Sequence, residues 1–171
     1  WESTHVTLWH GDALDVLRQM PDESVSMCVT SPPYNQANKI NRGRGRSARW
    51  HRMNGHTDWY PDDMAQAEYQ DAQTQVLQEL ARVLTPNGSI FYQHKPRYAR
   101  RGTYHPIDWI RQAASLELVQ EIIWARPGGI AFNAGLFVPS HESIYWMRRT
   151  DGIPRWPTRE AIRWGSVWRM N

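Results

Sequence analysis

A chain of 171 residues, 40% of them hydrophobic and with a mean hydropathy of −0.70, is expected to form one globular domain with a polar surface. No apolar stretch approaches the roughly 20 residues that would span a bilayer, and the single cysteine, Cys28, excludes an internal disulfide framework or a cysteine-based zinc site. The net charge is only +3, but just two of the 20 basic residues, Lys39 and Lys95, are lysines. We expect a cytoplasmic, arginine-rich protein.

The first predicted elements lead to an unusual proline motif. The pattern predicts a strand over residues 4–10, which ends at Gly11 and Asp12, and then a helix over 13–20 with its apolar residues on one face. A second strand is predicted over 25–29, where Cys28 is expected to be a buried, inert thiol. Ser-Pro-Pro-Tyr follows at 31–34, and two successive prolines cannot continue a helix or a sheet because both lack the backbone N–H.

A long basic loop is expected after the proline motif. Residues 36–60 show no apolar periodicity, and no acidic residue lies between Gln36 and Thr57. The loop carries a cluster of arginines: Arg42, Arg44, Arg46, Arg49 and Arg52. Such dense like charges repel one another unless a polyanion shares them. A nucleic-acid contact and a solvated Arg-Gly loop both remain open, and a high arginine content also fits a GC-rich genome.

The remaining pattern alternates helices and strands. It predicts a helix over 62–84 that stops at Pro86-Asn87-Gly88, a strand over 89–95, a helix over 105–116, and strands over 118–127 and 141–149. This order predicts an α/β fold with a mostly parallel sheet. We expect residues 1–171 to form a single domain with a basic, tryptophan-rich tail over 150–171. Three tryptophans within predicted elements are expected in the core: Trp109, Trp124 and Trp146.

The proline motif combines acceptors with an aromatic ring. Rigid polar residues just beyond the carboxyl end of a strand stand where open α/β sheets bind ligands. The Ser31 hydroxyl and the backbone carbonyls near Pro32 can accept hydrogen bonds, and Tyr34 offers a ring face for stacking. This set suits a planar ring with an amino group, whose nitrogen becomes a better nucleophile when its N–H groups are held and an electrophile lies in line. An ordinary proline turn is the alternative.

Several motifs, taken in order, resemble one family. WHGDALDVL precedes TSPPYN, and LQELARVLTPNGSIFYQHK, EIIWARP and HESIYWMRR follow it. Over nearly the whole chain this series resembles the permuted β group of DNA amino-methyltransferases, in which (Asp/Asn/Ser)-Pro-Pro-(Tyr/Phe) is the catalytic motif. The resemblance implies a Rossmann-like fold that uses S-adenosylmethionine.

The resemblance implies a catalytic role for four residues: Ser31, Pro32, Pro33 and Tyr34. Tyr34 would be the plate on which a base flipped out of DNA stacks. Serine before the two prolines favours the N4 amine of cytosine, with the N6 amine of adenine as the alternative. The arginines of the loop would contact phosphates or guanine edges, and Phe132 and Asn133 would lie near the target pocket.

The resemblance also implies a site for S-adenosylmethionine at two strand ends. Gly11 would allow close approach, Asp12 would accept a hydrogen bond from the adenine amine of the cofactor, and Thr30 would lie on the cofactor side. A helix N-cap is the alternative role for Asp12.

One family feature is missing from the sequence. No Phe-x-Gly-x-Gly loop follows a predicted strand: Gly43 and Gly45 lie among arginines, and Pro127-Gly128-Gly129 is not followed by a helix. In the family, the strands flanking that loop lie between the strand ending at Asp12 and the strand before Ser31. We therefore expect an incomplete sheet, in a chain that is a fragment, one half of a split enzyme or a relic without catalysis. We also expect weak binding of S-adenosylmethionine unless a second chain or a further segment supplies the loop.

Other functions remain open. A non-catalytic DNA-binding module would use the basic loop and tail, and related Pro-Pro-Tyr pockets methylate RNA or protein side-chain amides. A metal-dependent nuclease is disfavoured because neither clustered carboxylates with a lysine nor a histidine spacing typical of metal ligands occurs.

Overall fold

The computed structural model describes residues 5–35, 64–99, 102–126, 137–153, 163 and 165–169. Its helices are α1 (Ala13–Gln19), α4 (Gln66–Val83) and α5 (Ile107–Ile110). Its strands are β1 (Val25–Thr30), β2 (Leu84–His94), β3 (Arg97–Ala99), β4 (Gly102–Tyr104), β5 (Leu116–Ala125), β6 (His141–Arg149) and β7 (Val167–Arg169). Within these ranges, no helix is long and apolar enough to cross a membrane.

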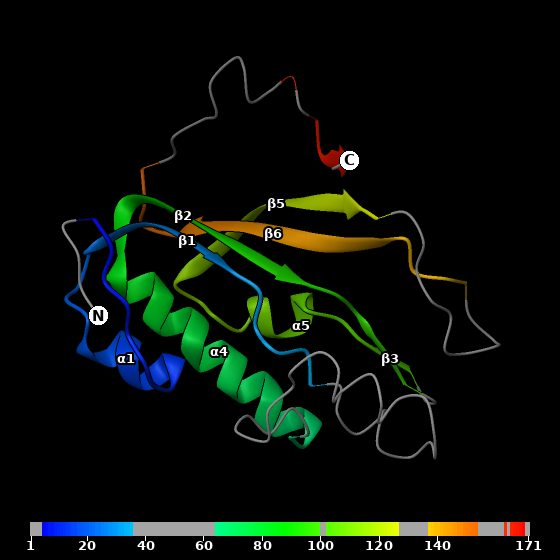
Figure 1. Cartoon of the computed structure of the whole chain (residues 1–171), viewed down its shortest axis with the longest axis horizontal. Coiled ribbons are helices and arrows are strands. Elements are labelled where there is room, and N and C mark those ends of the chain that lie inside the picture. The colour runs from blue at the N-terminus through cyan, green and yellow to red at the C-terminus, as the bar shows by residue number, and fades with distance from the viewer. Residues whose placement is uncertain are drawn as a thin grey trace.

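The main sheet is mixed, with strand order β1-β2-β6-β5-β7 (Figure 1). β1 pairs with β2, and β5 with β7, in parallel, whereas β6 runs antiparallel to both β2 and β5. The prediction of a mostly parallel sheet is therefore wrong. A parallel connection needs a crossover, usually a helix, and the sequence predicts only a loop between the strands that became β5 and β6. β3 and β4 form a separate two-stranded sheet.

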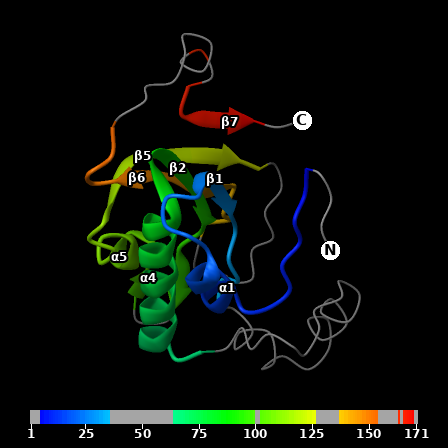
Figure 2. The ribbon, with the colours of Figure 1, turned by 90° about the vertical axis from the view of Figure 1, so that its left-hand side faces the viewer.

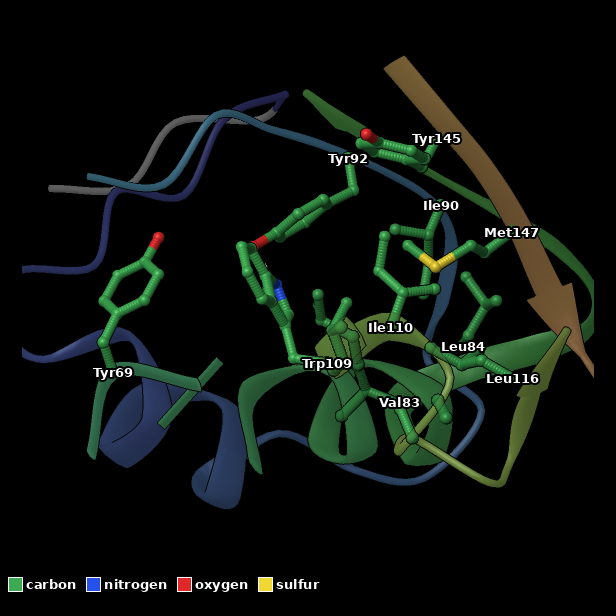
Figure 3. Close-up of a cluster of buried hydrophobic side chains, with 14 residues drawn as sticks. Tyr69, Val83, Leu84, Ile90, Tyr92, Trp109, Ile110, Leu116, Tyr145 and Met147 are labelled. Carbon is green, nitrogen blue, oxygen red and sulfur yellow. Dashed lines mark hydrogen bonds between the residues drawn. The ribbon is translucent and has the colours of Figure 1, made fainter. Parts of the chain in front are cut away.

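The core lies between the sheet and its helices, which all cover one face (Figures 1 and 2). α4 packs a row of residues at helical spacing into this core: Tyr69, Gln73, Leu77, Leu80 and Val83. Trp109 is 1% exposed, and its indole N–H donates to the Tyr92 hydroxyl over 3.1 Å (Figure 3). The core prediction is confirmed for Trp109 but not for Trp124 and Trp146, which are half-buried. Trp146 stacks on Phe91 with an interplanar angle of 12°.

Among the described strands, β1 forms one edge of the main sheet and pairs with β2 alone. The prediction of a strand over 4–10 is wrong for the described residues 5–10, which form only an isolated bridge at Thr7. Leu8 and Trp9 in this segment are 65% and 55% exposed, and Met27 and Val29 on β1 are 61% and 71% exposed. Alternation alone therefore does not make a continuous strand.

Other differences from the predicted elements are local. α1, β1, α4 and β6 confirm predicted elements within a few residues. β2 begins at Leu84, so Pro86 to Gly88 form a bulge, where the register slips from Val25↔Leu84 to Met27↔Ser89. At Gly88 a Cβ would lie 2.6 Å from the Leu84 side chain, so this bulge requires glycine. The helix predicted over 105–116 shortens to four residues, and β3, β4 and β7 were not predicted.

The core ends in a buried histidine. His94 is 1% exposed, with its ring centroid 5.8 Å from that of Tyr92 and 5.0 Å from that of Trp109. Burial lowers the pKa of His94 from 6.5 to about 4, because the aromatic surroundings disfavour the charged imidazolium. His94 is therefore neutral at physiological pH.

His94 makes stability depend on pH. Between pH 6.5 and about 4 the unfolded chain binds a proton at this residue that the folded chain does not bind. The contribution is fully present above pH 6.5, and we expect the free energy of unfolding to fall by up to about 3 kcal/mol as the pH drops through this range. Urea unfolding at several pH values measures it. His94→Gln should remove this part of the pH dependence, and His10→Gln, at an exposed histidine, should keep it. Equal slopes in both variants would contradict the assignment.

Candidate active site

Four chain segments meet at one edge of the sheet. Thr30, the last residue of β1, pairs with Tyr92 of β2, so residues 31–34 continue beside the last residues of β2. β6 runs the opposite way and begins at this edge, where Glu142 pairs with Trp124 near the end of β5. The edge thus collects the residues that follow the carboxyl ends of β1, β2 and β5, the position at which open α/β sheets bind ligands (Figure 1).

A chain of hydrogen bonds joins the proline motif to β6. Ser31 Oγ lies 2.9 Å from Tyr34 Oη, and the Tyr34 hydroxyl lies 3.3 Å from Oε2 of Glu142. Glu142 is 8% exposed and also accepts from Arg126 Nη1, over 2.6 Å, and from the Gln93 amide. One buried carboxylate therefore gathers three donors and ties the end of β1 to β2, β5 and β6.

A second system holds the Pro33 carbonyl. The Tyr69 hydroxyl of α4 donates to this carbonyl over 2.7 Å, and the same hydroxyl lies 2.7 Å from His94 Nε2. The His94 ring also contacts the backbone of Lys95, because Nδ1 lies 2.9 Å from its amide nitrogen and 2.8 Å from its carbonyl oxygen. The prediction that the backbone carbonyls near Pro32 are free to accept is therefore wrong for the carbonyl of Pro33. Among the described residues, none donates to the carbonyl of Pro32.

The Tyr34 ring is half-buried beside a cation. Lys95 Nζ lies 5.0 Å from its centroid, and the His94 ring lies 4.7 Å away at 50°. Burial raises the pKa of Tyr34, and the charge of Glu142 raises it further, so the phenol keeps its proton and can donate at neutral pH. The stacking role stays a prediction.

Asn35 closes the motif. It is 1% exposed and has a φ of 54°, a left-handed conformation that asparagine tolerates better than most residues. Its side-chain amide donates to the Met64 carbonyl over 3.0 Å, and Arg97 Nη1 donates to its backbone carbonyl over 2.7 Å. These contacts hold Asn35, the residue after the motif, against the segment that leads into α4 and against β3.

The residues predicted to bind the cofactor lie in two places. Asp12 is the N-cap of α1 and accepts through Oδ1 from the N–H groups of Leu14 and Asp15, over 2.9 and 3.4 Å. The alternative role of a helix cap is thus present. A Cβ on Gly11 would meet Val16 at 3.5 Å, an ordinary contact, so packing among the described residues does not require glycine there. Thr30 ends β1 beside the motif. The cofactor role of all three stays a prediction.

The predicted DNA-contacting arginines lie outside the described residues: Arg42, Arg44, Arg46, Arg49 and Arg52. Phe132, Asn133 and the Pro127–Gly129 segment lie outside them as well. Cys28 is half-buried, and burial raises its pKa, as expected for an inert thiol. Within the ranges that the structure describes, no group of three or more His, Cys, Asp or Glu side chains is placed to hold a metal ion.

Sequence reasoning missed the partners of the motif: Tyr69, Gln93, His94, Arg126 and Glu142. Four of them stand at or near predicted strand ends, in QHK, ARP and HES. This is a usable signal once the strand order is known, because strand ends that share an edge bring their polar residues together.

Comparisons with known proteins agree with this geometry. Residues 25–161 match the DNA methylase family (N6_N4_Mtase). The chain is 31% identical over 147 residues to the type II methyltransferase M.BglII of Bacillus subtilis, a match that covers 84% of this chain and 35% of that protein. It is 25% identical over 154 residues to M.ScaI of Streptomyces caespitosus, covering 87% and 43%. The chain thus spans less than half the length of these relatives.

Solved structures share the fold. PvuII DNA methyltransferase (cytosine-N4-specific) has a TM-score of 0.61 at 17% identity, covering 94% of this chain and 55% of that one. TTHA0409 of Thermus thermophilus, a putative DNA modification methylase complexed with S-adenosyl-L-methionine, has a TM-score of 0.56 at 20% identity, covering 93% and 64%. The predicted Rossmann-like methyltransferase fold is confirmed. Since the family match spans most of the chain, with the proline motif and all the partners of Tyr34 inside it, this chain belongs to the DNA methylase family.

Proposed function

We propose that this chain carries the catalytic site of a DNA methyltransferase that transfers a methyl group from S-adenosylmethionine to an exocyclic amine of a flipped base, with cytosine N4 as the target. The observation that carries the proposal is the exposed Ser31 hydroxyl, held 2.9 Å from Tyr34 at the carboxyl end of β1. Membership of the DNA methylase family supports the reaction. Serine before the two prolines favours cytosine.

The motif supplies what a base amine lacks. The lone pair of such an amine is delocalised into the ring, so the nitrogen is a weak nucleophile. Ser31 Oγ and the Pro32 carbonyl would accept its two N–H groups and favour a pyramidal nitrogen. S-adenosylmethionine, when bound, supplies a methyl group on a positively charged sulfur. The N–C bond forms as the C–S bond breaks, and the nitrogen then gives up one proton to water.

The target base must leave the duplex to reach Ser31. Flipping costs a few kcal/mol of stacking and pairing, which contacts in the pocket offset. Tyr34 would stack against the flipped base. Because Lys95 Nζ lies 5.0 Å from the centroid of that ring, a stacking base would displace this cation and free it for a phosphate.

Basic residues near the motif would hold the DNA backbone. Lys95 and Arg97 follow β2, and Arg126, with a side chain 54% exposed, follows β5. We propose that the loop over 36–60 and the tail over 150–171 extend this surface along the duplex, in one domain. Phosphate contacts of this kind make affinity fall steeply with salt.

The cofactor would bind between the ends of two segments. Gly11, Asp12 and Thr30 fit the adenine end of S-adenosylmethionine in part, because Asp12 Oδ1 already caps α1 and Oδ2 is left to accept an amine. The described residues hold no glycine-rich loop after a strand. We propose that a further segment or a second chain carrying that loop adds a strand beside β1, which pairs only with β2 among the described strands and exposes Met27 and Val29. DNA as substrate also favours the cytoplasm.

The base is identified by its product. DNA from methyltransferase-deficient bacteria is incubated with the chain and a high concentration of S-adenosylmethionine, and its nucleosides are measured by mass spectrometry. We expect N4-methylcytosine, whereas N6-methyladenine would keep the reaction and correct the base. Ser31→Ala should lower the yield at least about 100-fold, by removal of an acceptor at the reacting group, and leave DNA binding in a gel-shift assay intact.

Ser24→Ala is the matched control, because the Ser24 hydroxyl donates only to the Pro21 carbonyl, away from the motif. It should methylate as the unchanged chain does. DNA binding without any product would favour the non-catalytic DNA-binding module or a catalytic half that needs its glycine-rich segment, whereas full methylation by Ser31→Ala would contradict the role of Ser31.

Cofactor affinity tests the partial fit. Isothermal titration calorimetry of the chain alone with S-adenosylmethionine should show weak, unsaturated binding, because the described residues hold no glycine-rich loop after a strand. Asp12→Ala should weaken this binding further, and Asp15→Ala, next to it on α1, should not. Tight binding by the chain alone would contradict the proposed need for a glycine-rich segment.

A further inference from the structure

We infer that Glu142 is a positioning residue for the methyl transfer: through Tyr34, its carboxylate sets the direction of the hydrogen bonds so that Ser31 Oγ faces the substrate amine as an acceptor. The inference rests on the proposed function and extends it to a residue on another strand, 108 positions along the chain from Tyr34. It accounts for a buried carboxylate at the edge of the sheet that the reaction itself does not need to touch.

The argument starts from what Glu142 can do. As a carboxylate it has no proton to donate and accepts only. Arg126 donates to it over 2.6 Å, and a guanidinium favours a negative partner. The side-chain amide of Gln93 also donates a hydrogen bond to Glu142. A carboxylate with a side chain only 10% exposed needs such donors, because burial of an unpaired charge is costly.

The direction of the hydrogen bond to Glu142 determines the direction of the hydrogen bond between Tyr34 and Ser31. The Tyr34 hydroxyl has one proton, and the bond of 3.3 Å to Glu142 uses it. The contact of 2.9 Å between Tyr34 and Ser31 must therefore have Ser31 as donor, because Tyr34 has no second proton. With its own proton directed at Tyr34, Ser31 Oγ keeps both lone pairs for incoming N–H groups.

Without the carboxylate the direction is lost. Tyr34 could then donate to Ser31, and the Ser31 proton would be free to point at the substrate nitrogen, where it would engage the lone pair that must attack the methyl group. Glu142 excludes this arrangement before the substrate arrives, and successive bonds that run the same way strengthen one another.

Glu121 is a matched comparison. It lies on β5, next to β6, and accepts from the Ser143 hydroxyl over 2.6 Å. Like Glu142, it is a glutamate on a strand of the main sheet, but its hydrogen-bond partner, Ser143, does not bind the proline motif. Glu142→Gln and Glu121→Gln remove the same charge from neighbouring places and keep the side-chain volume.

The first measurement does not depend on catalysis. The chain is labelled with ¹³C at tyrosine Cζ, and Tyr34→Phe identifies the Tyr34 signal in the NMR spectrum. Glu142→Gln should shift this signal at neutral pH and let the phenol titrate at lower pH than in the unchanged chain, because the negative charge of Glu142 raises the pKa of Tyr34. Glu121→Gln should leave the signal in place. An unmoved Tyr34 signal in Glu142→Gln would overturn the inference.

The second measurement is kinetic, with the DNA and S-adenosylmethionine of the product assay. Glu142→Gln should lower kcat on the order of 10- to 100-fold at unchanged KM for DNA, as expected for a misdirected group at the reacting centre. Glu121→Gln should keep the kcat of the unchanged chain. Equal kcat in all three would overturn the inference.

The two measurements separate the proposals. If the NMR signal moves as expected but the unchanged chain forms no product under any condition, the proposed function is overturned, and the catalytic role of Glu142 with it, while the Glu142–Tyr34 bond stands. If product forms but Glu142→Gln behaves like Glu121→Gln in both assays, only the role of Glu142 is overturned.

Discussion

The parallel pairing of β1 with β2 decides where every part of the site lies. Because Thr30 pairs with Tyr92, both strands end at one edge, and residues 31–34 leave β1 beside Gln93 and His94. The antiparallel β6 must begin at that edge, which brings Glu142 to Tyr34. A slip of one residue would exchange the faces of Gln93 and His94 and break both hydrogen-bond systems of the motif.

The two systems hold the motif from different sides. On the helix-covered side, the Tyr69 hydroxyl lies 2.7 Å from His94 Nε2 and donates to the Pro33 carbonyl. On the other face of β2, where side chains alternate, Gln93 reaches Glu142, which holds Tyr34. The two prolines restrict φ but do not aim the serine, so these contacts supply the direction. The hydrogen bonds that hold the motif are thus in place before the reacting group arrives.

Local patterns predicted the elements that local forces decide. The helical spacing of α4 and the apolar run of β1 are visible in the sequence, because each needs only its own periodicity to be recognised. The predicted strand over 4–10 failed for the described residues 5–10 because a strand needs a continuous ladder, and these residues make only an isolated bridge at Thr7. The expected turn at Pro86 to Gly88 became a bulge because pairing with β1 continues on both sides of it. The predicted helix over 105–116 gave way after Ile110, where Ala113 and Leu116 enter the core from turns and from β5.

The sequence by itself determined the proline motif, its place after a strand and the family, because Ser31 to Tyr34 are contiguous and two prolines restrict the backbone whatever surrounds them. Only the tertiary structure decided which groups aim that motif. Glu142 and Arg126 come from distant parts of the chain, and Tyr69 comes from a helix whose pattern shows a core residue rather than a bond to Pro33. Whether these residues come together depends on the order of strands in the sheet. The direction of each hydrogen bond depends on which partner can only accept. Neither property can be predicted from a local stretch of sequence.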